Sequence, residues 1–220
     1  VQAEWREDRR GVGGEVLLFL DAGEGLPPVT VAEEAQVTLT TSEAGGMFGA
    51  AMYVGYPAAG RAVMLVGAPS EAAGNGVVYG FDLILPMPAT RDASNADMIY
   101  RGDPLDRAGS ALVAGPDLTG DGLFEVVVGA PGSGLGGISA GAVYLASGLP
   151  TGTVNLDDSA GLLLGETAGA RAGEALAMNL NGAGQAELVI GAPGEAGTGA
   201  AYLLTGPLSG MFTLNVADAR

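Results

Sequence analysis

The sequence contains no cysteine, no histidine and no lysine, so all nine of its basic residues are arginines. Without cysteine, disulfide bonds and thiol chemistry are excluded. Without histidine and lysine, the 220 residues cannot supply the base of a histidine-dependent triad, a Schiff base or a typical zinc site. Any chemistry within them has to rest on carboxylates, tyrosine, arginine or a metal ion.

Long hydrophobic runs are missing as well. Apolar residues make up 48% of the chain, yet no run approaches the ~18 residues of a membrane-spanning helix, so we expect no membrane insertion. The net charge of −16 argues against binding to nucleic acid, which is itself a polyanion, and suits cation binding. The chain starts at Val1 without an apolar signal segment. We therefore expect a mature, secreted chain in an extracellular, cell-surface or periplasmic location.

Glycine, in contrast, is abundant at 39 residues and marks an internal repeat. A Val/Ile-Gly-Ala-Pro signature occurs three times with a spacing of 62 residues, at Gly67, Gly129 and Gly191. A Gly-x-x-Tyr segment follows each signature and ends at Tyr79, Tyr144 and Tyr202. A stretch of small residues precedes each signature and starts at Gly49, Gly109 and Gly173. Three landmarks in the same order establish a repeat.

Each repeat is predicted to contain four strands. In the central repeat we expect strands at Ser110–Ala114, Glu125–Val128 and Ala142–Ala146 and an outer strand near Thr153–Leu156, after which Leu162-Leu-Leu leads into the next repeat. Four short strands per ~60 residues, repeated, are typical of β-propeller blades. The predicted fold class is therefore all-β, with blades of four antiparallel strands.

One loop of the central repeat has the composition of a cation site. Oxygen-bearing side chains alternate along it, at Asp117, Thr119, Asp121 and Glu125. Alternate residues of a tight loop point at one centre, which is what a hard cation such as Ca²⁺ requires. Glycines at 120 and 122 allow the positive φ angles of such a loop. The alternative is an acidic β-turn that binds nothing.

These residues resemble the FG-GAP repeat of the integrin α-subunit propeller and its bacterial relatives, over about residues 14 to 217. Phe48-Gly49 corresponds to "FG" and the three Gly-Ala-Pro tripeptides to "GAP", although later repeats have Ala108-Gly109 and Ala172-Gly173 in place of "FG". The resemblance implies that Asp117–Glu125 is the cation loop between the first two strands of a blade. It also adds the carbonyl of Leu123 as a backbone ligand.

The resemblance implies unequal cation sites in the three repeats. In the central repeat, Thr119 and Glu125 replace more usual residues, which favours a lower affinity. The third repeat keeps a weak second site and lacks one ligand at Ala183; its remaining candidates are Asn179, Asn181 and Glu187. The first repeat has no ligand side chain at the corresponding positions, which are Gly55, Pro57, Ala59 and Val63.

The ends of the sequence do not complete a ring. Gly14–Phe19 is predicted to be a third strand and Val29–Val31 its outer strand, and Val1–Trp5 is conceivable as a second strand. The predicted units are an N-terminal segment, a half blade, and blades with a degenerate, an intact and a degraded cation loop, at residues 1–13, 14–34, 35–96, 97–158 and 159–220. About three and a half blades would leave hydrophobic edges exposed. We therefore expect a part of a larger ring, completed by further blades or by another chain, and the resemblance to the integrin propeller implies about seven blades in that ring.

Three functions are compatible with this sequence. The first is a non-enzymatic extracellular adhesion or assembly module that is stabilised by Ca²⁺ and binds a protein or glycan through loops on one face. The second is a propeller enzyme, a polysaccharide lyase or hydrolase using carboxylate, tyrosine or arginine chemistry. The third is a subunit whose protein partner supplies the missing blades. Arg101-Gly102-Asp103 spells the tripeptide that integrins recognise, at a place where a polar turn is expected anyway.

Overall fold

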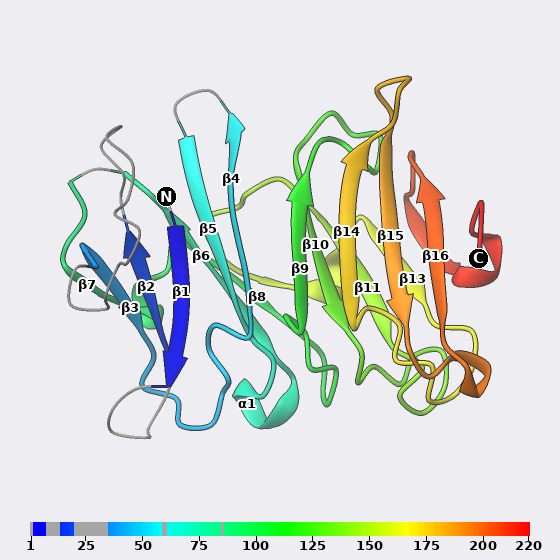
Figure 1. Cartoon of the computed structure of the whole chain (residues 1–220), viewed down its shortest axis with the longest axis horizontal. Coiled ribbons are helices and arrows are strands. Elements are labelled where there is room, and N and C mark those ends of the chain that lie inside the picture. The colour runs from blue at the N-terminus through cyan, green and yellow to red at the C-terminus, as the bar shows by residue number, and fades with distance from the viewer. Residues whose placement is uncertain (1, 8–13, 20–34, 59–60, 85) are drawn as a thin grey trace.

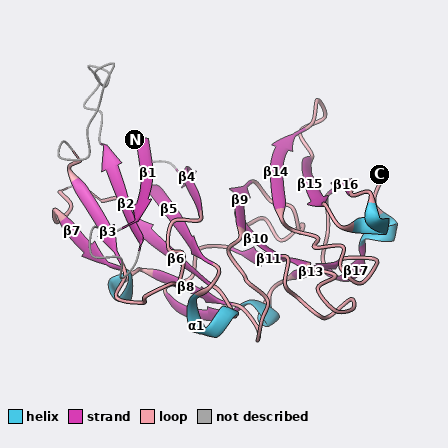
Figure 2. Cartoon of the chain, turned by 60° about the horizontal axis from the view of Figure 1, so that its bottom comes forward, coloured by secondary structure: helices cyan, strands magenta, loops and turns pink. Residues whose placement is uncertain are grey.

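The computed structural model describes residues 2–7, 14–19, 35–58, 61–84 and 86–220. Within these ranges the regular structure is almost entirely β-strand, arranged in four sheets. The sheets stand side by side in chain order along the long axis of the molecule, with the first and the last at opposite ends (Figures 1 and 2). The described residues therefore form an open arc of propeller blades, which confirms the predicted fold class.

Each sheet is built from strands that pair antiparallel in sequence order. The first sheet contains β1 (Gln2–Glu7), β2 (Gly14–Phe19) and β3 (Val37–Thr40). The second contains β4 (Ala51–Ala58), β5 (Arg61–Ala68), β6 (Val77–Asp82) and β8 (Met98–Arg101). The third contains β9 (Ala111–Gly115), β10 (Glu125–Ala130), β11 (Ala142–Ser147) and β13 (Gly161–Leu164). The fourth contains β14 (Ala175–Leu180), β15 (Ala186–Ala192) and β16 (Ala200–Thr205).

Three further strands link one sheet to the next. They are β7 (Thr90–Asp92), β12 (Gly152–Asn155) and β17 (Gly210–Thr213). Each follows the third strand of its own repeat but pairs in parallel with the outer strand of the preceding sheet, namely β3, β8 and β13. Each repeat thus contributes one short strand to the sheet before it.

These linking strands correct the prediction of the outer strands. The sequence predicts Thr153–Leu156 at the outer edge of the central blade, but β12 pairs with β8 of the preceding sheet. The outer strand of the central blade is β13, which contains the leucines that the sequence predicts in the connection to the next repeat. The reason is burial, because β13 is mostly buried whereas β12 is mostly exposed. Likewise, β17 follows the third strand of the last repeat but pairs with β13 of the third sheet.

The predicted unit limits fall too early for the same reason. The boundaries after residues 34, 96 and 158 separate the last antiparallel strand of each blade from the strands that precede it in the same sheet. The strands β3, β8 and β13 belong to the sheets that precede those boundaries. At the N-terminus, β1 (Gln2–Glu7) pairs antiparallel with β2, so a second strand does precede Gly14–Phe19, while Val1 lies outside the described residues. The proposed outer strand Val29–Val31 lies outside the described residues, and β3 occupies the outer position next to β2.

The buried hydrophobic residues that the structure describes form three clusters, one between each pair of successive sheets. Successive side chains of β10 alternate between two of them: Val126 and Val128 pack toward the second sheet, and Val127 packs toward the fourth. Because side chains of a strand point to opposite faces in turn, a strand between two sheets is buried on both. This explains why the central strands read as continuous apolar runs.

Backbone contacts between blades explain the glycine of Gly-Ala-Pro. The amide of Gly109, at the start of the third blade, donates a 3.0 Å hydrogen bond to the carbonyl of Gly129 in the same blade. A Cβ atom on Gly129 would lie 2.1 Å from the carbonyl oxygen of Gly173 in the next blade, and one on Gly67 would lie 2.1 Å from that of Gly109. Successive repeats therefore touch through backbone atoms where no side chain fits.

Short helical turns complete the fold. They are α1 (Glu71–Gly74) and the 3₁₀ turns at Ala93–Asn95, Leu156–Asp158, Glu195–Gly197 and Leu214–Val216. No helix among the described residues is long and apolar enough to cross a membrane.

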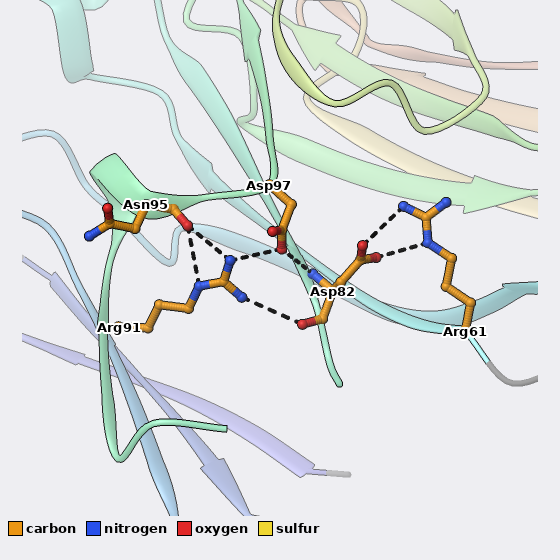
Figure 3. Close-up of polar contacts among 5 residues, drawn as sticks. All are labelled: Arg61, Asp82, Arg91, Asn95 and Asp97. Atoms are coloured by element: carbon orange, nitrogen blue, oxygen red, sulfur yellow. Dashed lines mark hydrogen bonds and ion pairs between the residues drawn. The ribbon is translucent and has the colours of Figure 1, made fainter. Parts of the chain in front are cut away.

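The turn after β7 is held by a polar network (Figure 3). Its centre is the Asp97 carboxylate, which accepts hydrogen bonds from the Asp82 amide at 2.7 Å and the Arg91 guanidinium at 2.8 Å. Arg91 also donates to the Asn95 carbonyl at 2.9 Å, and Arg61 pairs with the Asp82 carboxylate at 2.8 Å. Two of the nine arginines are thereby paired with acidic residues.

Candidate metal centre

A group of carboxylates gathers in the loop between β9 and β10. Oxygen atoms of Asp117, Asp121 and Glu125 lie within 4.8 Å of one another, and no other such group of three occurs among the described residues. The loop joins the first and second strands of the third sheet, where the sequence placed it. The structure thus brings together three of the five predicted ligand residues through their carboxylates.

The turn of this loop is built by glycines and by the first aspartate. Gly120 and Gly122 have φ angles of +89° and +81°, which L-residues with side chains rarely adopt. The Asp117 carboxylate accepts hydrogen bonds from the amides of Gly120 at 2.6 Å, Asp121 at 3.2 Å and Gly122 at 2.8 Å. A carboxylate has about four acceptor positions, so Asp117 can order the turn and still face an ion.

Glu125 forms the buried side of the group and is 0% exposed. Its carboxylate accepts hydrogen bonds from the Leu118 amide at 2.5 Å, the Thr119 hydroxyl at 2.8 Å and the Ser147 hydroxyl at 3.1 Å. Burial raises the pKa of Glu125, and these hydrogen bonds oppose the rise. Thr119 is 6% exposed and serves first as a donor to Glu125, while its oxygen keeps lone pairs for an ion.

Asp121 forms the open side of the group. Hydrogen bonds from Ser147 and from the Leu123 amide, the latter at 2.8 Å, lower the pKa of Asp121. The expected carbonyl ligand at Leu123 belongs to the same turn, and its side chain is half exposed. One wall of the site is therefore buried, while the other faces solvent.

Ser147 is the residue of this site that the sequence analysis missed. It ends β11 and lies opposite Glu125 in the strand register. The only signal is the register itself, because Ser147 is far from the loop in sequence. Its hydroxyl contacts Glu125 and lowers the pKa of Asp121, so it connects the buried and the open carboxylates.

The donor set fits a hard divalent cation. Three carboxylates, a hydroxyl and a nearby carbonyl are oxygen ligands of the kind that Ca²⁺ takes. No arginine pairs with Asp117, Asp121 or Glu125 in the described part of the chain. A bound cation would relieve the mutual repulsion of these carboxylates.

The weak second site has a different geometry. The pairing of β14 with β15 continues to Leu180 and Ala186, so the loop is a short hairpin and Asn179 lies within the strand. The Asn181 side-chain amide donates to Glu187 at 3.2 Å, and its oxygen accepts from the Ala183 amide at 2.9 Å. The Asn181 amide thus already serves the Glu187 carboxylate as the electropositive partner that a cation would otherwise provide.

The remaining candidates have structural surroundings. Gly55, Pro57 and Val63 lie in β4 and β5 and have no oxygen-bearing side chain, while Ala59 lies outside the described residues. In the 101–103 tripeptide, a Cβ atom on Gly102 would lie 2.4 Å from the Asn75 carbonyl oxygen. Packing alone therefore requires this glycine.

Comparison with known proteins adds to this geometry. Residues 108–145 match the family model of the FG-GAP repeat. The chain contains an FG-GAP repeat. The matched segment runs from Ala108 through the cation loop into β11, so the FG-GAP repeat is the third blade without its outer strand. The cluster of three carboxylates, from Asp117, Asp121 and Glu125, thus lies within the FG-GAP repeat.

A curated protein is similar over a longer stretch than the FG-GAP repeat. Phosphatidylinositol-glycan-specific phospholipase D of Bos taurus is 37% identical over 138 residues. The similar region covers 57% of this chain and 16% of that protein. This chain therefore spans only a small part of its relative's length.

Proposed function

We propose that this chain is a non-enzymatic propeller module that is stabilised by Ca²⁺ outside the cell and binds a protein or glycan partner. The observation that carries the proposal is the group of three carboxylates in the FG-GAP repeat. Ca²⁺ would join the β9–β10 loop to Ser147 on β11 through Glu125 and Asp121. Extracellular Ca²⁺ is ~1 mM, so a site with a Kd of ~10⁻⁴ M would be filled.

An enzymatic function has less support. The gathered carboxylates belong to one loop and share hydrogen bonds, an arrangement that suits an ion better than a substrate between two facing acids. These 220 residues contain no histidine, lysine or cysteine that could act as a base or nucleophile. The phospholipase D activity is that of a relative of which the match covers 16%, too small a share to support the same activity in this chain.

Removal of Ca²⁺ tests the proposal. Chelation by EDTA is expected to lower the melting temperature by several degrees, because repulsion among Asp117, Asp121 and Glu125 is then unscreened. Asp121→Ala should abolish this sensitivity and thereby identify the site. Differential scanning calorimetry with and without 1 mM CaCl₂, about the extracellular level, provides the measurement.

Glu187→Ala is the matched control, because Glu187 occupies the position of Glu125 in the last repeat. This variant should keep the full response to Ca²⁺. A melting temperature that EDTA leaves unchanged in the unsubstituted chain would contradict the proposal.

We further infer that another blade packs on the last sheet. Val127 and Leu145 face each other in the third sheet and are 0% exposed beneath the fourth. Their counterparts in the fourth sheet are paired in the same way, but Val189 is 39% exposed and Leu203 is only partly buried. Among the described residues, the fourth sheet also lacks a full outer strand, since Ala219 alone bridges to Leu203. A further repeat, in the same or a second chain, would cover this face.

Self-association tests this inference. The 220-residue chain alone should form dimers or larger species at ~10 µM, because an open apolar sheet face drives association. Val189→Asp should shift the population toward the 21.7 kDa monomer in native mass spectrometry. Ile84→Asp, at a residue that is 71% exposed, is the control and should change nothing. A monomeric unsubstituted chain would refute the inference.

A further inference from the structure

An open pocket of about 390 Å³ lies at the end of the third sheet opposite the cation loop. The cation loop precedes β10, whereas the pocket is lined by the loop that follows it. The connection from β8 to β9 and Arg171 from the next connection complete the lining. The pocket is thus built from three loops. Several of its residues differ from those at the equivalent positions of the other two repeats.

The loop after Gly-Ala-Pro is longest in the central repeat. It covers residues 132–140, against 70–75 and 194–198 in the other two repeats. The additional length carries two apolar side chains into solvent, Leu135 with 52% and Ile138 with 86% of its surface exposed. Large apolar side chains that are not buried in the fold and lie together in solvent are typical of a contact surface.

Leu105, on the facing connection, has an unfavourable backbone conformation. Its φ is +67°, and the equivalent residues of the neighbouring repeats, Gly45 and Gly169, have φ angles of +74° and +80°. Glycine adopts this region freely, whereas leucine pays a steric cost there. The Leu105 side chain is 69% exposed, so burial in the fold does not compensate the cost. Backbone strain without a structural gain is a feature of functional positions.

Arg107 supplies an unpaired positive charge in the same pocket. Arg61, Arg91, Arg171 and Arg220 each lie within 4.0 Å of a carboxylate, but Arg107 has no ion pair in the described structure. Its neighbour Asp106 is 2% exposed and accepts a hydrogen bond from Tyr144 in the core, so it faces away from the pocket. In a chain of net charge −16, this free guanidinium is available for an anionic ligand.

We propose that this pocket binds a carboxylate that lies beside a large aliphatic or aromatic side chain, presented by a partner polypeptide. Arg107 would hold the carboxylate, and Leu105 and Ile138 would cover the apolar side chain. The carboxylate is either a chain terminus or an acidic side chain, since both have the same chemistry. This inference rests on the proposed binding function and specifies the partner's chemistry.

Small peptides provide the probes. We would titrate the ¹⁵N-labelled 220-residue chain, with CaCl₂ present, with N-acetyl-Phe-Leu as the free acid and as the C-terminal amide. N-acetyl-Glu-Phe amide carries the same carboxylate on a side chain and distinguishes the two sources. We expect the free acid to bind with a Kd on the order of 1 mM and the uncharged amide at least tenfold more weakly. The chemical shifts that move should be those of residues 104–107 and 131–139.

Two substitutions separate binding from folding. Arg107→Gln should weaken binding of the acid at least tenfold. Leu105→Gly should weaken it about fivefold while the fold is kept, because glycine suits a φ of +67°. Arg101→Gln removes another exposed arginine that does not line this pocket, and it should leave the affinity unchanged.

Equal binding of acid and amide, an Arg107→Gln variant with full affinity, or shifts elsewhere in the chain would each overturn the proposal. Shifts at the pocket that depend on protein concentration without peptide would assign it to a second copy of this chain, and would overturn it too. If the peptides do not bind but the melting temperature still responds to Ca²⁺, the pocket proposal is wrong and the proposal of a calcium-stabilised module stands.

Discussion

Replacing Gly129 by alanine is expected to lower the free energy of unfolding by about 3 kcal/mol, or to prevent folding. The added Cβ atom would lie 2.1 Å from the Gly173 carbonyl oxygen, and both atoms belong to backbone that cannot rotate away. Relief would require the third and fourth sheets to separate, which exposes part of the cluster that includes Val127 and Ile190. Overpacking of this kind typically costs 1–3 kcal/mol, and backbone contacts lie at the upper end.

The chain contains its own control for this prediction. Gly191 is the same glycine in the last repeat, but a Cβ atom there would lie no closer than 3.2 Å to its nearest neighbour, the Ala175 side chain. Gly191→Ala should therefore stay within about 1 kcal/mol of the unsubstituted chain, while Gly67→Ala should behave like Gly129→Ala. Urea denaturation of the three variants is the measurement. Equal stability of Gly129→Ala and Gly191→Ala would contradict the contact between blades.

This difference bears on the proposed further blade. Gly191 tolerates a side chain because no following repeat touches it in the described part of the chain. In an assembly where another blade packs on the fourth sheet, its backbone would meet Gly191 as Gly173 meets Gly129. Gly191→Ala should then weaken association while leaving the chain itself folded.

The fold could be predicted from the sequence as far as local patterns repeat. The 62-residue spacing of Gly67, Gly129 and Gly191 established the blades, and the apolar runs located their inner strands to within two residues. The cation loop was predictable because its carboxylates lie within nine consecutive positions, 117–125. Local spacing specifies such features without knowledge of the tertiary structure.

Pairings between distant segments were not predictable. Thr153–Leu156 and Leu162-Leu-Leu are both short strand-forming segments, and only the neighbouring blade decides that the first pairs with β8 and the second with β11. Ser147 enters the cation site through the β10–β11 register, which single-sequence patterns do not specify. The three leucines of Leu162-Leu-Leu are the one sequence signal that favours pairing of this segment with the buried strand β11.

The tyrosines of the repeat are a further case. The hydroxyls of Tyr79 and Tyr144 bond to carboxylates that come from different positions in their blades. Tyr79 donates to Glu71 at 2.5 Å, after Gly-Ala-Pro, whereas Tyr144 donates to Asp106, before the blade starts. Ser133 stands at the position of Glu71, so each of these two blades keeps one carboxylate at this place. A repeat pattern read position by position does not reveal this exchange.

Tyr144→Phe is therefore expected to lower the free energy of unfolding by about 2 kcal/mol at pH 7, because it leaves the buried Asp106 carboxylate without its hydroxyl donor. Tyr202→Phe is the matched control. Tyr202 is equally buried, but its hydroxyl makes no direct hydrogen bond of normal geometry, although burial and then the nearby Glu166 and Glu195 raise its pKa. Its loss should therefore cost less than that of the Tyr144 hydroxyl. Thermal and urea unfolding of both variants give the comparison, and equal losses would contradict a specific role for the Asp106 bond.

The pH dependence of this loss provides a sharper test. Burial raises the pKa of Asp106, and the hydrogen bond from Tyr144 opposes that rise. A carboxyl whose pKa is raised in the folded state contributes stability below its unfolded pKa of about 3.9 and loses it as pH rises through the folded value. Without Tyr144 the folded pKa rises further, so Tyr144→Phe should lose more stability between pH 4 and pH 7 than the unsubstituted chain. If the difference in unfolding free energy between Tyr144→Phe and the unsubstituted chain is the same at pH 4 and pH 7, the hydrogen bond from Tyr144 does not affect the ionisation of Asp106.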